Sequence, residues 1–98
     1  MGNSMKGAAF LIESRLSEAA QGSSNAYFDL GMIYSSGSEG IDVDLIEAHK
    51  WFNLAALSGH DESKICRAEI SLEMTAREIA EAQRDARSWL QDNTRRAA

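Results

Sequence analysis

The fold of this chain is decided by residues 26–59, which read AYFDLGMIYSSGSEGIDVDLIEAHKWFNLAALSG. In the first part of this stretch, apolar residues recur at spacings of three, four and seven, at Ala26, Leu30 and Ile33. Such spacing places side chains on one face of a helix. We therefore expect a helix from about residue 25 to residue 35.

A loop and a second helix follow in the same stretch. Gly37 and Gly40 suit a loop because glycine adopts positive φ without steric cost. Asp44 then stands three residues before Glu47, which is the spacing of a capping box at a helix start. This helix is expected to run to residue 58, with Gly59 as its stop. Its expected apolar face consists of Ala48, Trp51, Phe52, Ala55 and Ala56.

Gly31 lies inside the first of these two helices, where a glycine costs about 1 kcal/mol relative to alanine. The usual compensation is close approach by another helix. We expect that approach to bring Gly31 opposite the small residues Ala55 and Ala56 of the second helix.

Three further helices are expected on either side of this pair. One spans about residues 5–21 and ends in the polar segment 22–25, which supplies a cap for the next helix. Another is expected to start with Asp61 as its cap and to run to residue 74. Thr75 and Glu78 form a capping box for a last helix, which should reach about residue 91. Because no segment alternates polar and apolar residues, the sequence predicts an all-α protein.

Parts of the chain resemble each other. Ala48-x-x-Trp51 recurs as Ala86-x-x-Trp89, and the pair Ala19-Ala20 recurs as Ala55-Ala56. These shifts of 38 and 36 residues are typical of helical-hairpin repeats, whose units stack because none of them buries its apolar face alone.

The spacing of about a dozen residues in this stretch resembles a Sel-one-like repeat, a relative of the tetratricopeptide repeat. The resemblance covers about a third of the chain and implies a short α-α superhelix, or solenoid, of about five helices within a single domain, 1–98. Residues 22–59 match best, residues 60–91 resemble a degenerate repeat, and 92–98 form a tail. The positions that match are Ala26, Leu30, Gly31, Tyr34, Gly37, Gly40, Ile41, Asp44, Ala48, Trp51, Phe52, Ala55, Ala56 and Gly59.

The same resemblance implies a non-catalytic adaptor or scaffold that binds a peptide or a partner helix in a groove. In such arrays the first helix of each repeat lines the concave surface. The alternative for Phe28 and Met32 is packing against a neighbouring helix. The expected partner-binding residues are Asn25, Phe28, Asp29, Met32, Ser35, Glu62, Ile65 and Glu69.

No arrangement of residues in the sequence indicates an enzyme, a metal site or a cofactor. The only histidines, His49 and His60, belong to no HExxH-like pair. The single cysteine, Cys66, is expected to be a small buried residue. The glycines of the loop follow a helix and not a strand, so they do not form a phosphate-binding loop.

Composition and charge restrict the kinds of partner that the chain is expected to bind. A net charge of −5 argues against binding to nucleic acid. No apolar run approaches the length of a membrane-spanning helix, and the run at residues 8–12 is too short for a signal peptide. A cytoplasmic protein with a reduced cysteine is therefore expected. Phe10, Leu11 and Ile12 together exceed what one helix stripe can bury, which favours a homodimer.

Overall fold

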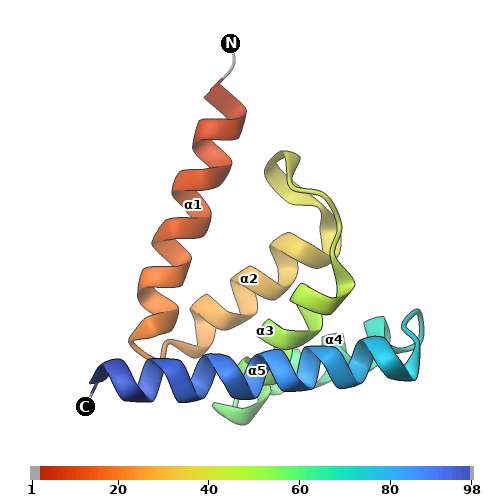
Figure 1. The fold of residues 1–98 in the computed structure, drawn as a ribbon. Coiled ribbons are helices and arrows are strands. Elements are labelled where there is room, and N and C mark those ends of the chain that lie inside the picture. Colours follow the sequence, from red (N-terminus) through yellow and green to blue (C-terminus); the bar gives the residue numbers. More distant parts are fainter. Residues whose placement is uncertain (1–2, 98) are drawn as a thin grey trace.

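The computed structural model describes the backbone of residues 3–97 and the side chains of residues 7–38 and 40–94. These residues form five α-helices and one turn of 3-10 helix, and none of them lies in a strand (Figure 1). The predicted all-α class is confirmed. The elements are α1 (Asn3–Ala20), α2 (Ser24–Ser36), η1 (Ser38–Gly40), α3 (Leu45–Leu57), α4 (Asp61–Ser71) and α5 (Ala76–Ala97).

Two of the predicted helix starts have the expected hydrogen bonds. The Asp44 carboxylate accepts a hydrogen bond from the backbone N–H of Glu47 at 3.0 Å. At the start of α5, the N–H of Glu78 donates to Thr75 Oγ1 at 3.1 Å, and the N–H of Thr75 donates to Glu78 Oε1 at 2.8 Å. This reciprocal pair is a complete capping box.

The predicted cap of α4 is wrong by one residue. His60, not Asp61, has the extended backbone of a cap, and its Nδ1 accepts a hydrogen bond from the N–H of Ser63 at 3.3 Å. Asp61 is already the first residue of the helix. A carboxylate in the first turn is still favourable there, because it lies near the positive end of the helix dipole.

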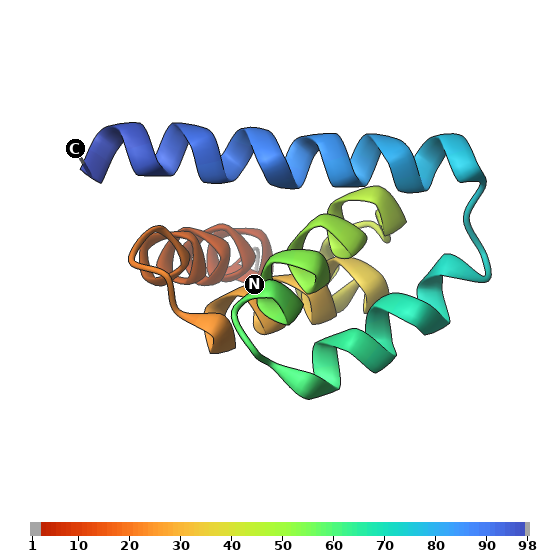
Figure 2. The same cartoon turned by 90° about the horizontal axis from the view of Figure 1, so that it is seen from below.

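α3 lies at the centre of the molecule. Trp51, Phe52 and Leu54 on this helix are each only 1% exposed. α2, α4 and α5 all pack on α3, whereas α1 packs on α2 and η1. In Figure 2, α3 lies between α5 and α4.

Aromatic rings from three helices fill the core. The ring of Tyr27 on α2 lies 6.1 Å from that of Trp51 and 5.5 Å from that of Trp89 on α5. The two tryptophan rings meet edge to face at 5.4 Å. Small residues around these rings let the helices approach closely: Ala19, Ala26, Ala55 and Ala86 are all buried in the same cluster.

Another helix does approach closely at Gly31, but the prediction of which residues lie opposite it is wrong. A Cβ atom added to Gly31 would lie 2.5 Å from two ring carbons of Phe52. The glycine thus makes room for a large ring on α3, and not for backbone contact through Ala55 and Ala56.

α4 and α5 are consecutive helices that hardly contact each other. Each packs on α3, and they diverge on either side of it (Figure 2). In a helical hairpin, by contrast, the two helices bury their apolar faces against each other. The segment 92–98, expected as a tail, continues α5 as far as Ala97, and Ala98 lies outside the described residues.

Candidate interaction surface

Neither a metal centre nor a nucleophilic site is apparent in the described part of the chain. Its His, Cys, Asp and Glu side chains form no group of three that could hold a metal ion. Burial, together with the nearby carboxylates of Glu62 and Glu69, raises the pKa of the Cys66 thiol. Since the thiolate is the nucleophilic form, this thiol is poorly suited to attack a substrate at neutral pH.

The outward side of α2 carries the first half of the predicted partner-binding residues. Asn25 is exposed, and the Met32 side chain is exposed over 42% of its surface. Phe28 is half-buried, because its ring lies 4.6 Å from the ring of His60 and 5.9 Å from that of Phe52. Phe28 therefore packs against neighbouring elements, whereas Met32 stays open to solvent.

Two polar residues predicted for this surface already have partners within the chain. Asp29 forms an ion pair with Arg15 on α1, with 3.1 Å between the carboxylate oxygen and Nε. The Ser35 hydroxyl donates to the backbone carbonyl of Met32 at 3.2 Å.

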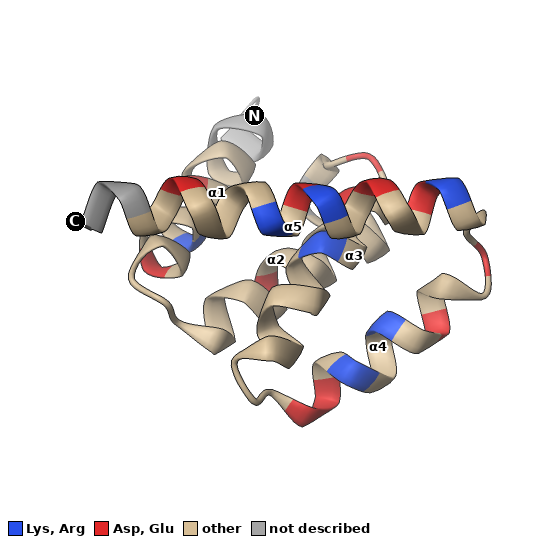
Figure 3. Ribbon diagram, turned by 60° about the horizontal axis from the view of Figure 1, so that its bottom comes forward, with Lys and Arg blue, Asp and Glu red and all other residues tan. Residues whose placement is uncertain are grey.

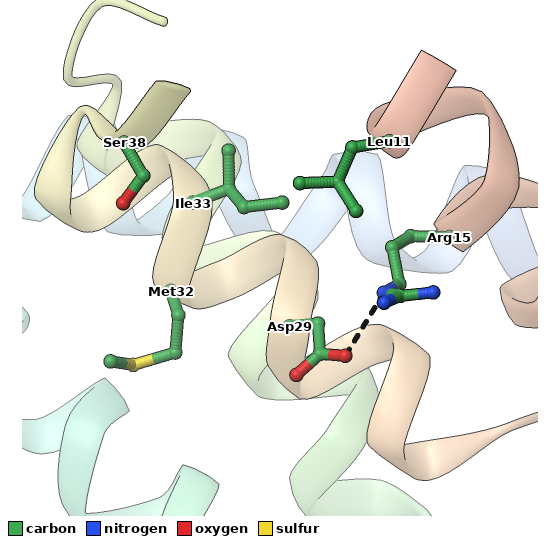
Figure 4. A pocket seen from close by; sticks show the side chains of 6 residues that line it. All are labelled: Leu11, Arg15, Asp29, Met32, Ile33 and Ser38. Atoms are coloured by element: carbon green, nitrogen blue, oxygen red, sulfur yellow. Dashed lines mark ion pairs between the residues drawn. The ribbon is translucent and has the colours of Figure 1, made fainter. Parts of the chain in front are cut away.

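An open pocket of about 330 Å³ lies beside Asp29 and Met32 (Figure 4). It is formed between α1 and α2, with one residue of η1. Figure 4 shows Leu11 and Arg15 of α1 facing α2 across the hollow, with the ion pair to Asp29 at one side. Its lining residues are Leu11, Arg15, Asp29, Met32, Ile33 and Ser38.

Four of these lining residues were not predicted from the sequence. Arg15 and Leu11 belong to α1, and only the packing of that helix on α2 turns them toward the pocket. The one local feature of the sequence that marks Arg15 is its spacing of three residues from Glu18. This spacing suits the ion pair that the two side chains form at 2.8 Å on the helix surface.

The second half of the predicted surface lies on α4, and none of it lines this pocket. Glu62 and Glu69 are exposed, and the Ile65 side chain is exposed over 63% of its surface. The connection between the two halves is the stack of Phe28 on His60, the residue that caps α4. The predicted residues thus form two neighbouring patches, one beside the pocket and one on α4.

Charges on the outer helices are mixed. Figure 3 shows that basic residues are interspersed with acidic ones along the described parts of α4 and α5. A nucleic-acid interface requires basic residues that gather on one face, and these two helices do not have that pattern. Among the described residues, no helix is long and apolar enough to cross a membrane.

Comparisons of the chain with protein families, with curated proteins and with solved structures found no match.

Proposed function

We propose that the chain is a non-catalytic protein-interaction module of the Sel-one-like type, which holds a peptide or a partner helix against the outward side of α2. The observation that supports this proposal is the open pocket with Met32 on its rim. A hydrophobic side chain exposed beside a hollow is a common feature of binding sites on protein surfaces.

The chemistry of the pocket defines the kind of segment it fits. Leu11 and Ile33 offer apolar contact, and Met32 adapts its shape to different anchors. Arg15 is held by Glu18 and Asp29 in ion pairs of a surface type worth about 0–1 kcal/mol each. A partner with apolar anchors and Lys or Arg between them could thus engage these carboxylates at little cost. Its apolar anchors should supply most of the affinity.

Substitution of Met32 by Glu tests this proposal. The parent protein is used to select peptides from a library of random sequences displayed on phage, and the selected peptides are then titrated against variants. We expect enrichment of peptides with apolar anchors and basic residues. Met32→Glu should weaken their binding at least tenfold, or about 1.4 kcal/mol, because it places a charge where an anchor is desolvated.

Gln83→Glu on α5 is the matched control, because it adds the same charge at an exposed position on another helix. It should bind the selected peptides like the parent. Circular dichroism should show both variants folded. Equal binding by Met32→Glu and the parent, or a selection without enrichment, would contradict the proposed function.

Self-association is the second candidate function, and the position of Phe10 favours it. Ala8 and Ala19 of α1 are buried, whereas Phe10 on the same helix is 74% exposed. Burial of one such side chain contributes about 1.5–3 kcal/mol. A symmetric dimer would bury this residue from both copies.

For this second function, sedimentation at high micromolar concentration should show a dimer. Phe10→Glu should be a monomer of unchanged helix content. A parent that sediments as a monomer at that concentration would exclude self-association through α1.

A further inference from the structure

α4 packs on α3, but nearly all of its residues stay at least partly exposed. Only one of its residues, Ser63, is fully buried. It packs on α3 but hardly contacts α5, which is held on α3 directly through the buried Ala82 and Ala86. α4 could therefore leave its place without removing α5 from the core.

One of the contacts that hold α4 requires an unprotonated nitrogen on His60. Its Nδ1 accepts the backbone N–H of Ser63 at 3.3 Å and lies 2.9 Å from the Ser63 hydroxyl. A backbone N–H can only donate, so Nδ1 must carry a lone pair in this arrangement. The cap of α4 thus depends on a side chain that accepts a hydrogen bond at this position.

A second histidine lies in the interface between α3 and α4. His49 is 3% exposed, and its Nδ1 is buried without a hydrogen-bond partner. Burial, and the nearby guanidinium of Arg67 on α4, lower the pKa of His49 below its ordinary value of 6.5. The neutral imidazole is thus the form that fits this interface.

The other charged groups near the two histidines do not replace these requirements. Asp61 and Glu62 follow His60 on its own helix and are exposed to solvent. From α2, His60 meets the uncharged ring of Phe28. The neighbouring Asp29 is paired with Arg15 toward α1. On α3, the two other ionisable side chains, Glu47 and Lys50, form an ion pair with each other at 3.4 Å.

From this geometry we infer that α4 is a pH-sensitive flap, docked on α3 while His49 is neutral and released when His49 takes up a proton. His49 takes up a proton more readily when α4 is released than when it is docked. By linkage, docking is strongest above the ordinary histidine value of 6.5 and weakens as the pH falls below it. Release would uncover the side of α3 at Asn53, whose side-chain oxygen accepts a hydrogen bond from Arg67 of the docked α4. This inference concerns the attachment of α4 and does not depend on the proposed partner.

Amide hydrogen exchange of the whole chain tests the inference, with rates corrected for the intrinsic effect of pH. The readout is the protection of residues 61–71 compared with that of residues 45–57. Between about pH 7.5 and about pH 5.5, we expect protection of α4 to fall severalfold, up to about tenfold, while α3 stays protected, because pH 5.5 lies about one pH unit below the ordinary histidine value of 6.5. Equal protection of α4 at both pH values would overturn the inference. Simultaneous loss from α3 and α4 would also overturn it, because it would indicate global acid unfolding.

One variant connects the effect to His49. His49→Leu removes the titrating group from the interface between α3 and α4, so the fall in protection of α4 should be much smaller than in the parent. If His49→Leu responds to pH like the parent, His49 does not control the flap.

Discussion

Trp51→Ala is expected to lower the free energy of unfolding by about 3–5 kcal/mol. The side chain is 1% exposed and packs between the rings of Tyr27 and Trp89. Its removal leaves a cavity between three helices, which cannot all move inward to fill it. Because native domains are stable by only about 5–15 kcal/mol, this change could unfold the chain at ambient temperature. The measurement is urea denaturation followed by far-UV circular dichroism, which does not depend on tryptophan emission.

Trp51→Phe is the control for this experiment. The indole Nε1 of Trp51 is buried without a hydrogen-bond partner, so a phenyl ring loses no hydrogen bond there. It also keeps most of the contacts with Tyr27 and Trp89. We expect a cost well below that of alanine. Equal stability of the alanine variant and the parent would show that this ring is not central to the core.

Gly31→Leu should have the second largest effect, a destabilisation of about 1–3 kcal/mol or more. Any side chain at this position starts with a Cβ atom 2.5 Å from the ring of Phe52. Phe52 is itself 1% exposed and packs against the ring of Phe28, so its ring cannot move aside without disturbing the core. The denaturation midpoint should therefore fall although leucine is the better helix former.

Gly7→Leu separates helix propensity from overpacking. Gly7 also lies in a helix, but no atom would lie within 4 Å of a Cβ added to it. This variant should be as stable as the parent or gain up to about 1 kcal/mol. If Gly31→Leu behaves like Gly7→Leu, the ring of Phe52 does not restrict position 31.

The helices could be predicted from the sequence because their signals are local. Asp44 with Glu47, and Thr75 with Glu78, sit at the spacing at which a side chain reaches a free N–H of the first turn. The apolar spacing of α2 and α3 likewise marks one face of each helix. His60 was missed as a cap because Asp61 is the more common capping residue, and only the backbone angles decide between neighbours.

What could not be predicted depends on how the helices cross. The partner of Gly31 is Phe52 because of the relative shift of α2 and α3, which neither helix encodes by itself. The pocket needs Arg15 of α1 beside Asp29 of α2, and this pairing joins residues 14 positions apart. The separation of α4 from α5 has the same origin, since each of these helices finds its apolar contacts on α3.

The pairing of α2 with α3 also bears on the order in which the chain folds. The two helices are consecutive, and the N–H of Asp44 donates to the carbonyl of Tyr34 at 2.9 Å where the chain returns. Contacts between segments so close in sequence require little loop-closure entropy, so they can form early. This hairpin would then serve as the folding nucleus onto which α5 and α1 dock. Substitutions within it should slow folding, whereas those in α4, outside this hairpin, should mainly speed unfolding.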